Sequence, residues 1–218
     1  TERNFDPEKV AEVEVNKFIL NNREVDRVMV VLGSTGCSHY ITGYGCSMCG
    51  HLNGTPDKPV TTNQYIKQWE NLISGKSLDK KYRKNFDLNK YRILCLYNLG
   101  SLLNPKEISL KAVREIFSSL ANFKGIKKVI IESRAEYINP DVLQNIKDVY
   151  PGIVEVGMGL ESSDYTIREL CHHKNMPDLN VYKEAIKVLH KYNFKVLTYV
   201  NQKPVFLTEK EAIDDAVK

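Results

Sequence analysis

Residues 27–32 read Arg27-Val-Met-Val-Val-Leu32, a short run rich in β-branched side chains that is typical of a buried strand. Four similar runs follow along the chain, and segments with helical periodicity separate them. The five predicted strands span residues 27–32, 91–97, 128–132, 153–160 and 194–200. Strands that alternate with helices through short connections predict parallel β/α units, whose chemistry lies at the carboxyl ends of the strands.

The predicted helices carry recognisable start signals or one-sided apolar patterns. Thr61 or Thr62 can cap a helix whose apolar residues recur at helical spacing up to residue 73. Asp178 can cap a later helix, and Thr208 with Glu211 has the form of a capping box. The helix after Asp178 is expected over residues 179–192, and three others over residues 7–20, 110–123 and 140–150.

These elements predict an α/β fold, as an open doubly wound sheet or a full or partial barrel. We expect a helical lead-in over residues 1–26 and one core domain over residues 27–218. The sequence begins without Met, and no sixth strand follows the last predicted helix. We therefore expect a piece of a longer protein, incomplete at its C-terminus.

The composition is that of a soluble globular protein. The chain has 218 residues, a net charge of +4 and 42% hydrophobic residues. It has no run of about 18 apolar residues, which argues against a membrane span. Its N-terminus is polar, which argues against a secretory signal. Five cysteines, an odd number, indicate a reducing, cytoplasmic setting rather than a disulfide framework. A basic stretch, Lys76–Arg92, is either a solvated loop or an RNA contact.

Three of the cysteines follow the first predicted strand. Cys37, Cys46 and Cys49 have the spacing C-x8-C-x2-C. Three thiolates on one loop can hold three irons of a [4Fe–4S] cluster and leave the fourth iron open. The alternative is a structural zinc site in which His39 or His51 supplies the fourth ligand. Cys95 and Cys171, by contrast, are expected to be packing residues.

Polar residues and glycines end the next four predicted strands. Because the carboxyl ends of parallel strands meet at one edge, these residues are candidates for a common site. Buried charges are costly unless they are paired or bound to a ligand, and the guanidinium of Arg134 suits a carboxylate. Ordinary turns and a helix-capping carboxylate at Glu161 are the alternatives. The candidates are Asn98, Gly100, Ser101, Glu132, Ser133, Arg134, Gly157, Gly159, Glu161, Tyr199 and Lys203.

The cysteine loop and the order of strands and helices resemble the radical S-adenosylmethionine (SAM) superfamily. The resemblance implies a partial (βα)6 TIM-like barrel, here without its last unit, and a [4Fe–4S] cluster on Cys37, Cys46 and Cys49. It also implies one-electron cleavage of SAM to a 5′-deoxyadenosyl radical. The implied cofactor-binding residues are Met48, Asn98, Gly100, Ser101, Glu132, Arg134, Gly159, Glu161 and Tyr199, with Lys203 a candidate for the substrate.

Within that superfamily the chain is most similar to the radical SAM proteins of archaeosine biosynthesis, the RaSEA group, which are related to the elongator catalytic-subunit type of radical SAM domain. The resembling motifs run in the same order from about residue 27 to 215. They are Gly45-Cys-Ser-Met-Cys-Gly50 with Asn53, Leu99-Gly-Ser-Leu102, Ile131-Glu-Ser-Arg-Ala-Glu-Tyr137, Glu155-Val-Gly-Met-Gly-Leu-Glu-Ser162 and the segment 203–215.

This closer resemblance implies a lyase-type reaction on tRNA. The reaction is C–N cleavage in the lysine adduct of 7-cyano-7-deazaguanine, which forms archaeosine. The implied partners are tRNA bearing the modified 7-deazaguanine, the lysine-adding archaeosine synthase and an electron donor. Two alternatives stay open, namely a radical SAM enzyme with another tRNA or small-molecule substrate, and a zinc-stabilised nucleic-acid-binding module.

Overall fold

The computed structural model describes residues 5–43, 45–50, 55, 58–76, 78 and 86–218. Its six strands form a single sheet in the order β1-β2-β3-β4-β5-β6, in which β1 runs antiparallel to β2 and the other neighbours are parallel. The strands are β1 Glu12–Leu20, β2 Arg23–Val31, β3 Ile93–Tyr97, β4 Lys128–Glu132, β5 Ile153–Glu161 and β6 Lys195–Val200. The predicted α/β class is confirmed, whereas the partial barrel stays a prediction.

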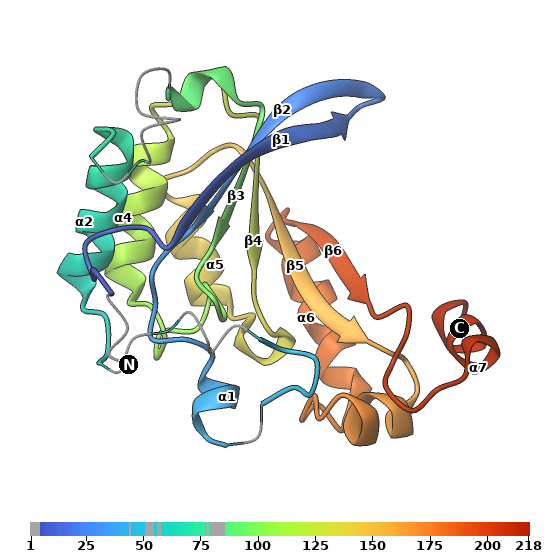
Figure 1. The fold of residues 1–218 in the computed structure, drawn as a ribbon. Coiled ribbons are helices and arrows are strands. Elements are labelled where there is room, and N and C mark those ends of the chain that lie inside the picture. The colour runs from blue at the N-terminus through green and yellow to red at the C-terminus, as the bar shows by residue number, and fades with distance from the viewer. Residues whose placement is uncertain (1–4, 44, 51–54, 56–57, 77, 79–85) are drawn as a thin grey trace.

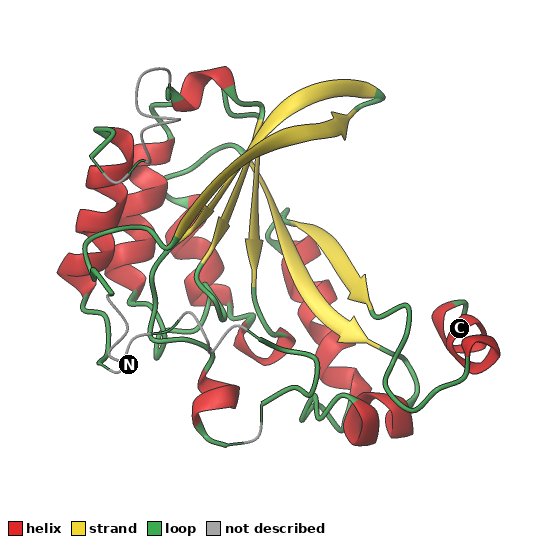
Figure 2. Ribbon diagram, in the orientation of Figure 1, coloured by secondary structure: helices red, strands yellow, loops and turns green. Residues whose placement is uncertain are grey.

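Helices follow the parallel strands in chain order (Figures 1 and 2). The α-helices are α1 Ser38–Ile41, α2 Thr62–Ile73, α4 Leu110–Leu120, α5 Pro140–Lys147, α6 Leu179–Lys191 and α7 Glu209–Ala216. Shorter turns are η2 Leu88–Lys90, η3 Ala135–Tyr137 and the π-type turn η4 Ile167–Cys171. Among the described residues, no helix is both long and apolar enough to cross a membrane.

The predicted helix starts are confirmed by side-chain caps. Thr61 and Gln64 form a capping box at α2, Asp178 accepts from the backbone of Asn180 at α6, and Thr208 forms a capping box at α7. Helices α4 and α5 end at residues 120 and 147, before the predicted 123 and 150. Bonds from residue i+3 to residue i appear there, from Asn122 to Ser119 and from Val149 to Ile146, which tightens the last turn.

The helix predicted over residues 7–20 is wrong, because residues 12–20 form strand β1. Val13 and Val15 alternate with exposed residues, the period of a strand with one covered face. Asn21 and Asn22 both have positive φ, 51° and 59°, which builds the tight turn that joins β1 to β2 in a hairpin. The expected boundary of the core domain at residue 27 stays a prediction.

The two faces of the sheet differ. Leu94, Leu96, Val129 and Ile131 belong to the main core, which includes residues of α2, α4, α5 and α6. Residues of opposite parity, such as Ile93, Cys95 and Ile130, form a second, smaller cluster with Met29, Tyr97 and Leu197. Figure 1 shows these four helices on one side of the sheet. The smaller cluster therefore lies on the face of the sheet that these four helices do not cover.

Candidate active site

The cysteine loop begins where β2 ends. Cys37 is the N-cap residue of the one-turn helix α1, and the Cys49 amide donates to the Cys46 carbonyl over 3.0 Å, closing the C-x2-C turn. All three cysteines are partly buried and not disulfide-bonded. The loop therefore lies at the carboxyl edge of the sheet, as the sequence predicted.

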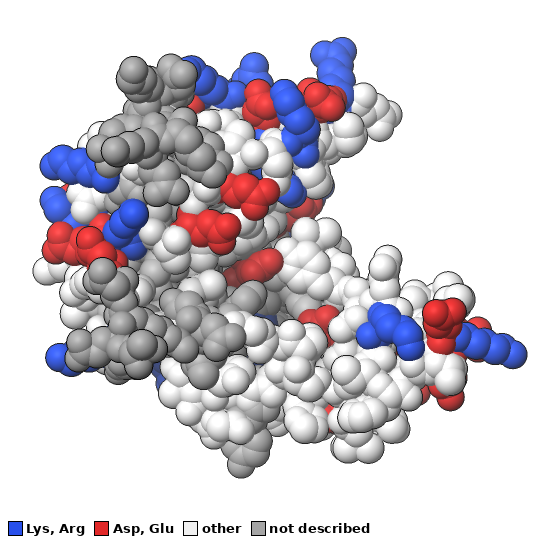
Figure 3. Space-filling view, in the orientation of Figure 1, with Lys and Arg blue, Asp and Glu red and all other residues white. Residues whose placement is uncertain are grey.

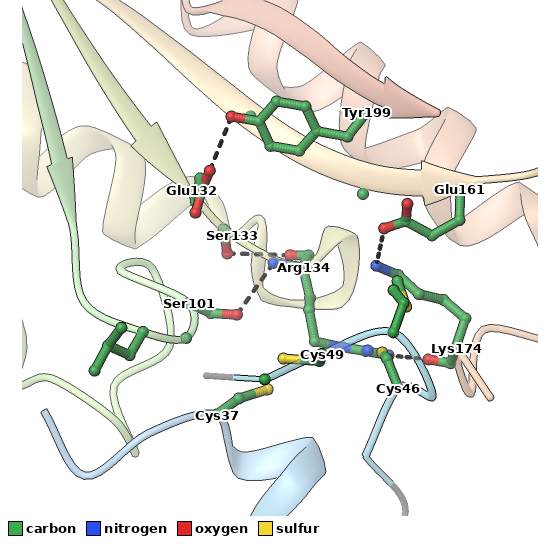
Figure 4. Close-up of a pocket in the computed structure, with 16 residues that line it drawn as sticks. Cys37, Cys46, Cys49, Ser101, Glu132, Ser133, Arg134, Glu161, Lys174 and Tyr199 are labelled. Carbon is green, nitrogen blue, oxygen red and sulfur yellow. Dashed lines mark hydrogen bonds and ion pairs between the residues drawn. The ribbon is translucent and has the colours of Figure 1, made fainter. Parts of the chain in front are cut away.

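The three cysteines line one pocket together with residues from the ends of β3, β4, β5 and β6 (Figure 4). The pocket has a volume of about 280 Å³. Its lining residues are Cys37, Cys46, Met48, Cys49, Gly50, Leu99, Gly100, Ser101, Glu132, Ser133, Arg134, Gly157, Gly159, Glu161, Lys174 and Tyr199.

The turn after β3 is fastened to the cysteine loop by Glu107. This buried carboxylate accepts from the Ser101 amide over 2.5 Å, from the Ser38 amide over 2.8 Å and from the side-chain amide of Asn104 over 2.9 Å. A β-carbon at Gly100 would collide with the Glu107 carboxylate and approach Cα of Cys37 to 3.1 Å. Glycine is thus required where these two segments meet.

Two residues at the end of β4 point to different partners. Glu132 Oε1 accepts from the Tyr199 hydroxyl over 2.9 Å, which joins β4 to β6 across β5. Arg134 is buried, and its Nε pairs with the Glu136 carboxylate. Its Nη2 donates to the carbonyls of Lys174 and Asn175 over 2.8 and 3.2 Å. Arg134 therefore ties the pocket to the segment after η4.

The end of β5 contributes an ion pair to the pocket wall. Glu161, with a positive φ of 65°, accepts from Lys174 Nζ over 2.9 Å, and both side chains are largely buried. A β-carbon at Gly159 would collide with both partners of this pair, and one at Gly157 would come within 2.7 Å of the Tyr199 hydroxyl. The glycines predicted as site residues thus keep the pocket open between charged and polar side chains.

Cations around the cysteines oppose the effect of burial on the thiol pKa values. Burial raises the pKa of the Cys37 thiol, which Glu107 raises further and Arg134 lowers. Burial also raises the pKa of the Cys46 thiol, while Lys174 and Arg134 lower it. Figure 4 shows the Arg134 guanidinium among the three cysteines. These cations favour thiolates, the form in which cysteine binds metals.

All the predicted cofactor residues except Asn98 line the pocket, whereas the substrate candidate Lys203 does not. Asn98 is buried beside it, and its side-chain amide has no hydrogen-bond partner among the described residues. Lys203 lies outside, and its ammonium group contacts the Leu207 carbonyl in its own turn. A flexible lysine side chain at a strand end can bond to a carbonyl of its local turn instead of reaching a site, so the sequence alone could not place it.

Two residues of the site were not assigned to it from the sequence. The polar sequence His172-His173-Lys174-Asn175 is typical of a solvated turn, but the side chains of His172 and Lys174 are buried. Glu107 was not singled out at all. Both carry charge near an otherwise ordinary loop, and only tertiary contacts show that they are buried against the cysteine segment.

The three thiols are donors that an iron–sulfur cluster or a zinc ion could use. Three thiols from one loop line the same pocket, and cations face them. Within the described ranges, neither these three cysteines nor any other group of three His, Cys, Asp or Glu side chains is arranged to hold a metal ion. His39 Nε2 donates to the His173 carbonyl over 3.0 Å, which leaves Nδ1 as the nitrogen of His39 that could bind a metal. His51 lies outside the described residues.

Comparison with known proteins finds relatives of similar sequence. No family model matches it. An uncharacterized protein of Methanocaldococcus jannaschii is 33% identical over 189 residues, 86% of this chain and 49% of that protein. Archaeosine synthase subunit beta of Thermococcus kodakarensis is 26% identical over 193 residues, 87% of this chain and 56% of that protein. The same subunit of Methanosarcina acetivorans is 25% identical over 201 residues, 92% of this chain and 55% of that protein.

The chain thus spans about half the length of these relatives. Among solved structures, a queuine lyase from Clostridium spiroforme bound to SAM and queuine covers 92% of this chain and 86% of its own, with a TM-score of 0.49 and 18% identity. The kinship predicted from the motifs is confirmed in that archaeosine synthase beta subunits are among the chain's homologues.

Proposed function

We propose that this chain is the radical SAM part of a tRNA-modifying enzyme. The observation that carries the proposal is the single pocket in which Cys37, Cys46 and Cys49 meet the ends of four parallel strands. A metal-binding loop at the carboxyl edge of a parallel sheet is where a reactive cofactor belongs. A partial barrel, formed by curvature of this sheet, is part of the same proposal.

The three cysteines would hold a [4Fe–4S] cluster with one open iron. When bound, such a cluster supplies the electron that cleaves SAM to a 5′-deoxyadenosyl radical. The protein's own contribution is to bind and orient SAM, for which the pocket offers backbone at Gly100 and Gly159 and the polar side chains of Ser101, Glu132, Glu161 and Tyr199. Arg134 would hold the protein around the cysteines instead of SAM, because its Nε pairs with Glu136 and its Nη2 donates to two carbonyls.

The relatives' names support tRNA carrying a 7-deazaguanine as the substrate. Two of them are named archaeosine synthase subunit beta. In the proposed reaction the radical chemistry that SAM supplies would act on the lysine side of a lysine–deazaguanine adduct, and cleavage of its C–N bond would give the amidine of archaeosine. The lysine-adding synthase and an electron donor are the proposed partners.

The test is metal analysis followed by turnover. We expect the anaerobically purified chain to contain about four irons and four sulfides, and to form 5′-deoxyadenosine when dithionite and SAM are added. Zinc without sulfide would leave the nucleic-acid-binding module as the surviving interpretation. With active enzyme, mass spectrometry of tRNA bearing the lysine adduct separates archaeosine formation from a reaction on another substrate.

We propose an RNA contact at the opposite end of the sheet. Four of the seven basic residues in the stretch Lys76–Arg92 lie outside the described residues, but its last residue, Arg92, lines a pocket with Arg23 and Lys127. None of these three cations forms an ion pair with a described residue. Figure 3 shows basic side chains gathered near the β1–β2 turn, beside some acidic ones. Unpaired cations of this kind suit backbone phosphates.

Reversing two of these charges, in Arg23→Glu/Lys127→Glu, is expected to weaken tRNA binding. The negative slope of log affinity against log salt should become shallower by about two units, because roughly two phosphate contacts are lost. Filter binding over a salt series measures both quantities. The control is Lys183→Glu/Lys187→Glu, which makes the same charge change on exposed positions of α6. Equal losses in the two variants would show a general charge effect and no specific contact.

A further inference from the structure

Five consecutive backbone carbonyls accept hydrogen bonds from the cysteine loop or from Arg134. They belong to residues 171–175, which we call the support segment. Ser47 Oγ donates to the Cys171 carbonyl over 2.6 Å, and the Ser47 amide donates to the His172 carbonyl over 3.0 Å. His39 Nε2 donates to the His173 carbonyl over 3.0 Å, and Arg134 Nη2 donates to the next two. Every carbonyl of the segment is thus engaged.

The donors lie beside the metal-binding cysteines. Ser47 sits between Cys46 and Cys49, and His39 is two residues after Cys37. The segment therefore holds the cysteine loop at both of its ends, although more than 120 residues separate the two in sequence. Glu107 holds the loop from the other side, through the Ser38 amide.

The support segment is itself held in one conformation. His173 and Asn175 both have positive φ, 51° and 50°, while their side chains are exposed. The side chain of Lys174 turns the other way, into the pocket, where it pairs with Glu161. Just upstream, the buried Arg168 accepts from the Lys174 amide through its carbonyl and donates to the carbonyls of Ser162 and Met176. The carbonyl row is thus held by contacts within the protein.

We infer that the support segment is a positioning element that sets the geometry of the cysteine loop for its metal cluster. A free loop carrying three ligands must lose conformational entropy when the ligands converge. Three hydrogen bonds from the loop to a fixed row of carbonyls restrict it in advance, so cluster binding costs less. The part of this inference that concerns the cluster rests on the proposed function. The part that concerns the order of the loop does not.

The test changes backbone conformation and leaves the donors in place. In His173→Val/Asn175→Val, β-branched residues occupy two positions of positive φ, which is strongly unfavourable for them. In the control, His173→Gly/Asn175→Gly, glycine adopts the same φ without a steric penalty. Neither change removes a buried side chain, since both positions are exposed. Ser47→Ala is a milder companion, because it deletes one hydrogen bond and keeps the segment.

Two readouts separate the order of the loop from the cluster. The first is hydrogen exchange at the Ser47 amide in the chain without added iron. The second is the rate at which iron is lost to a chelator after reconstitution. We expect both to rise about tenfold or more in the valine variant, less in Ser47→Ala, and little in the glycine control. Thermal unfolding of all variants shows whether the rest of the fold is intact.

Native protection of Ser47 in the valine variant would overturn the inference. Should no variant bind iron at all, the proposed function fails, while exchange at Ser47 still decides whether the segment positions the loop. Equal exchange in the valine and glycine variants would also contradict the inference, because then the positive φ angles do not maintain the row of carbonyls.

Discussion

Replacing Cys46 with alanine is expected to abolish SAM cleavage. Loss of a second-shell residue costs a metal site about 10–100-fold, so loss of one of three ligands should reduce 5′-deoxyadenosine formation by more than about a hundredfold. The same variant should bind less than a full cluster, because the pocket has no other described cysteine to take its place. The measurements are iron and sulfide per chain and deoxyadenosine formed with dithionite and SAM.

The matched control for Cys46→Ala is Cys95→Ala. Cys95 is a buried free cysteine on β3 that packs in the smaller core cluster and does not line the pocket. Its truncation removes one sulfur atom from the core, so stability should fall by about 1 kcal/mol, while iron content stays native. Full iron and turnover in Cys46→Ala would refute the assignment of the cysteine loop.

Replacing Glu107 with alanine is expected to give the largest loss of stability among single changes near the pocket. The buried carboxylate accepts three hydrogen bonds, two of them from backbone amides. Leaving buried donors unsatisfied costs about 1–3 kcal/mol each, so we expect the free energy of unfolding to fall by about 3–5 kcal/mol. Urea unfolding, followed by circular dichroism and by the fluorescence of the buried Trp69, measures this change.

Two companion variants make the Glu107 result specific. Glu107→Gln keeps the shape but turns an amide donor toward donors, so an intermediate loss is expected. Glu115→Ala, at an exposed position of α4, should stay within about 0.5 kcal/mol of native. If Glu107→Ala were as stable as Glu115→Ala, the carboxylate would not be the link between the β3 turn and the cysteine loop.

The sequence by itself determined the elements whose causes are local. Apolar runs and helical periodicity predicted the five parallel strands, and Thr61, Asp178 and Thr208 predicted where helices begin. These signals work because a cap or an amphipathic face acts within a few residues. The sequence also placed the cysteines and the glycines at strand ends, since all parallel strands present their carboxyl ends at one edge.

The tertiary structure alone decided what depends on distant partners. Residues 12–20 form a strand because β2 is beside them, although their pattern can also be interpreted as a helix. Lys174 enters the pocket because Glu161 and the carbonyls held by Arg134 turn its segment inward. Glu107 becomes part of the site only when the turn after β3 meets the cysteine loop. Burial and pairing of charges are properties of the packed chain, so no local pattern encodes them.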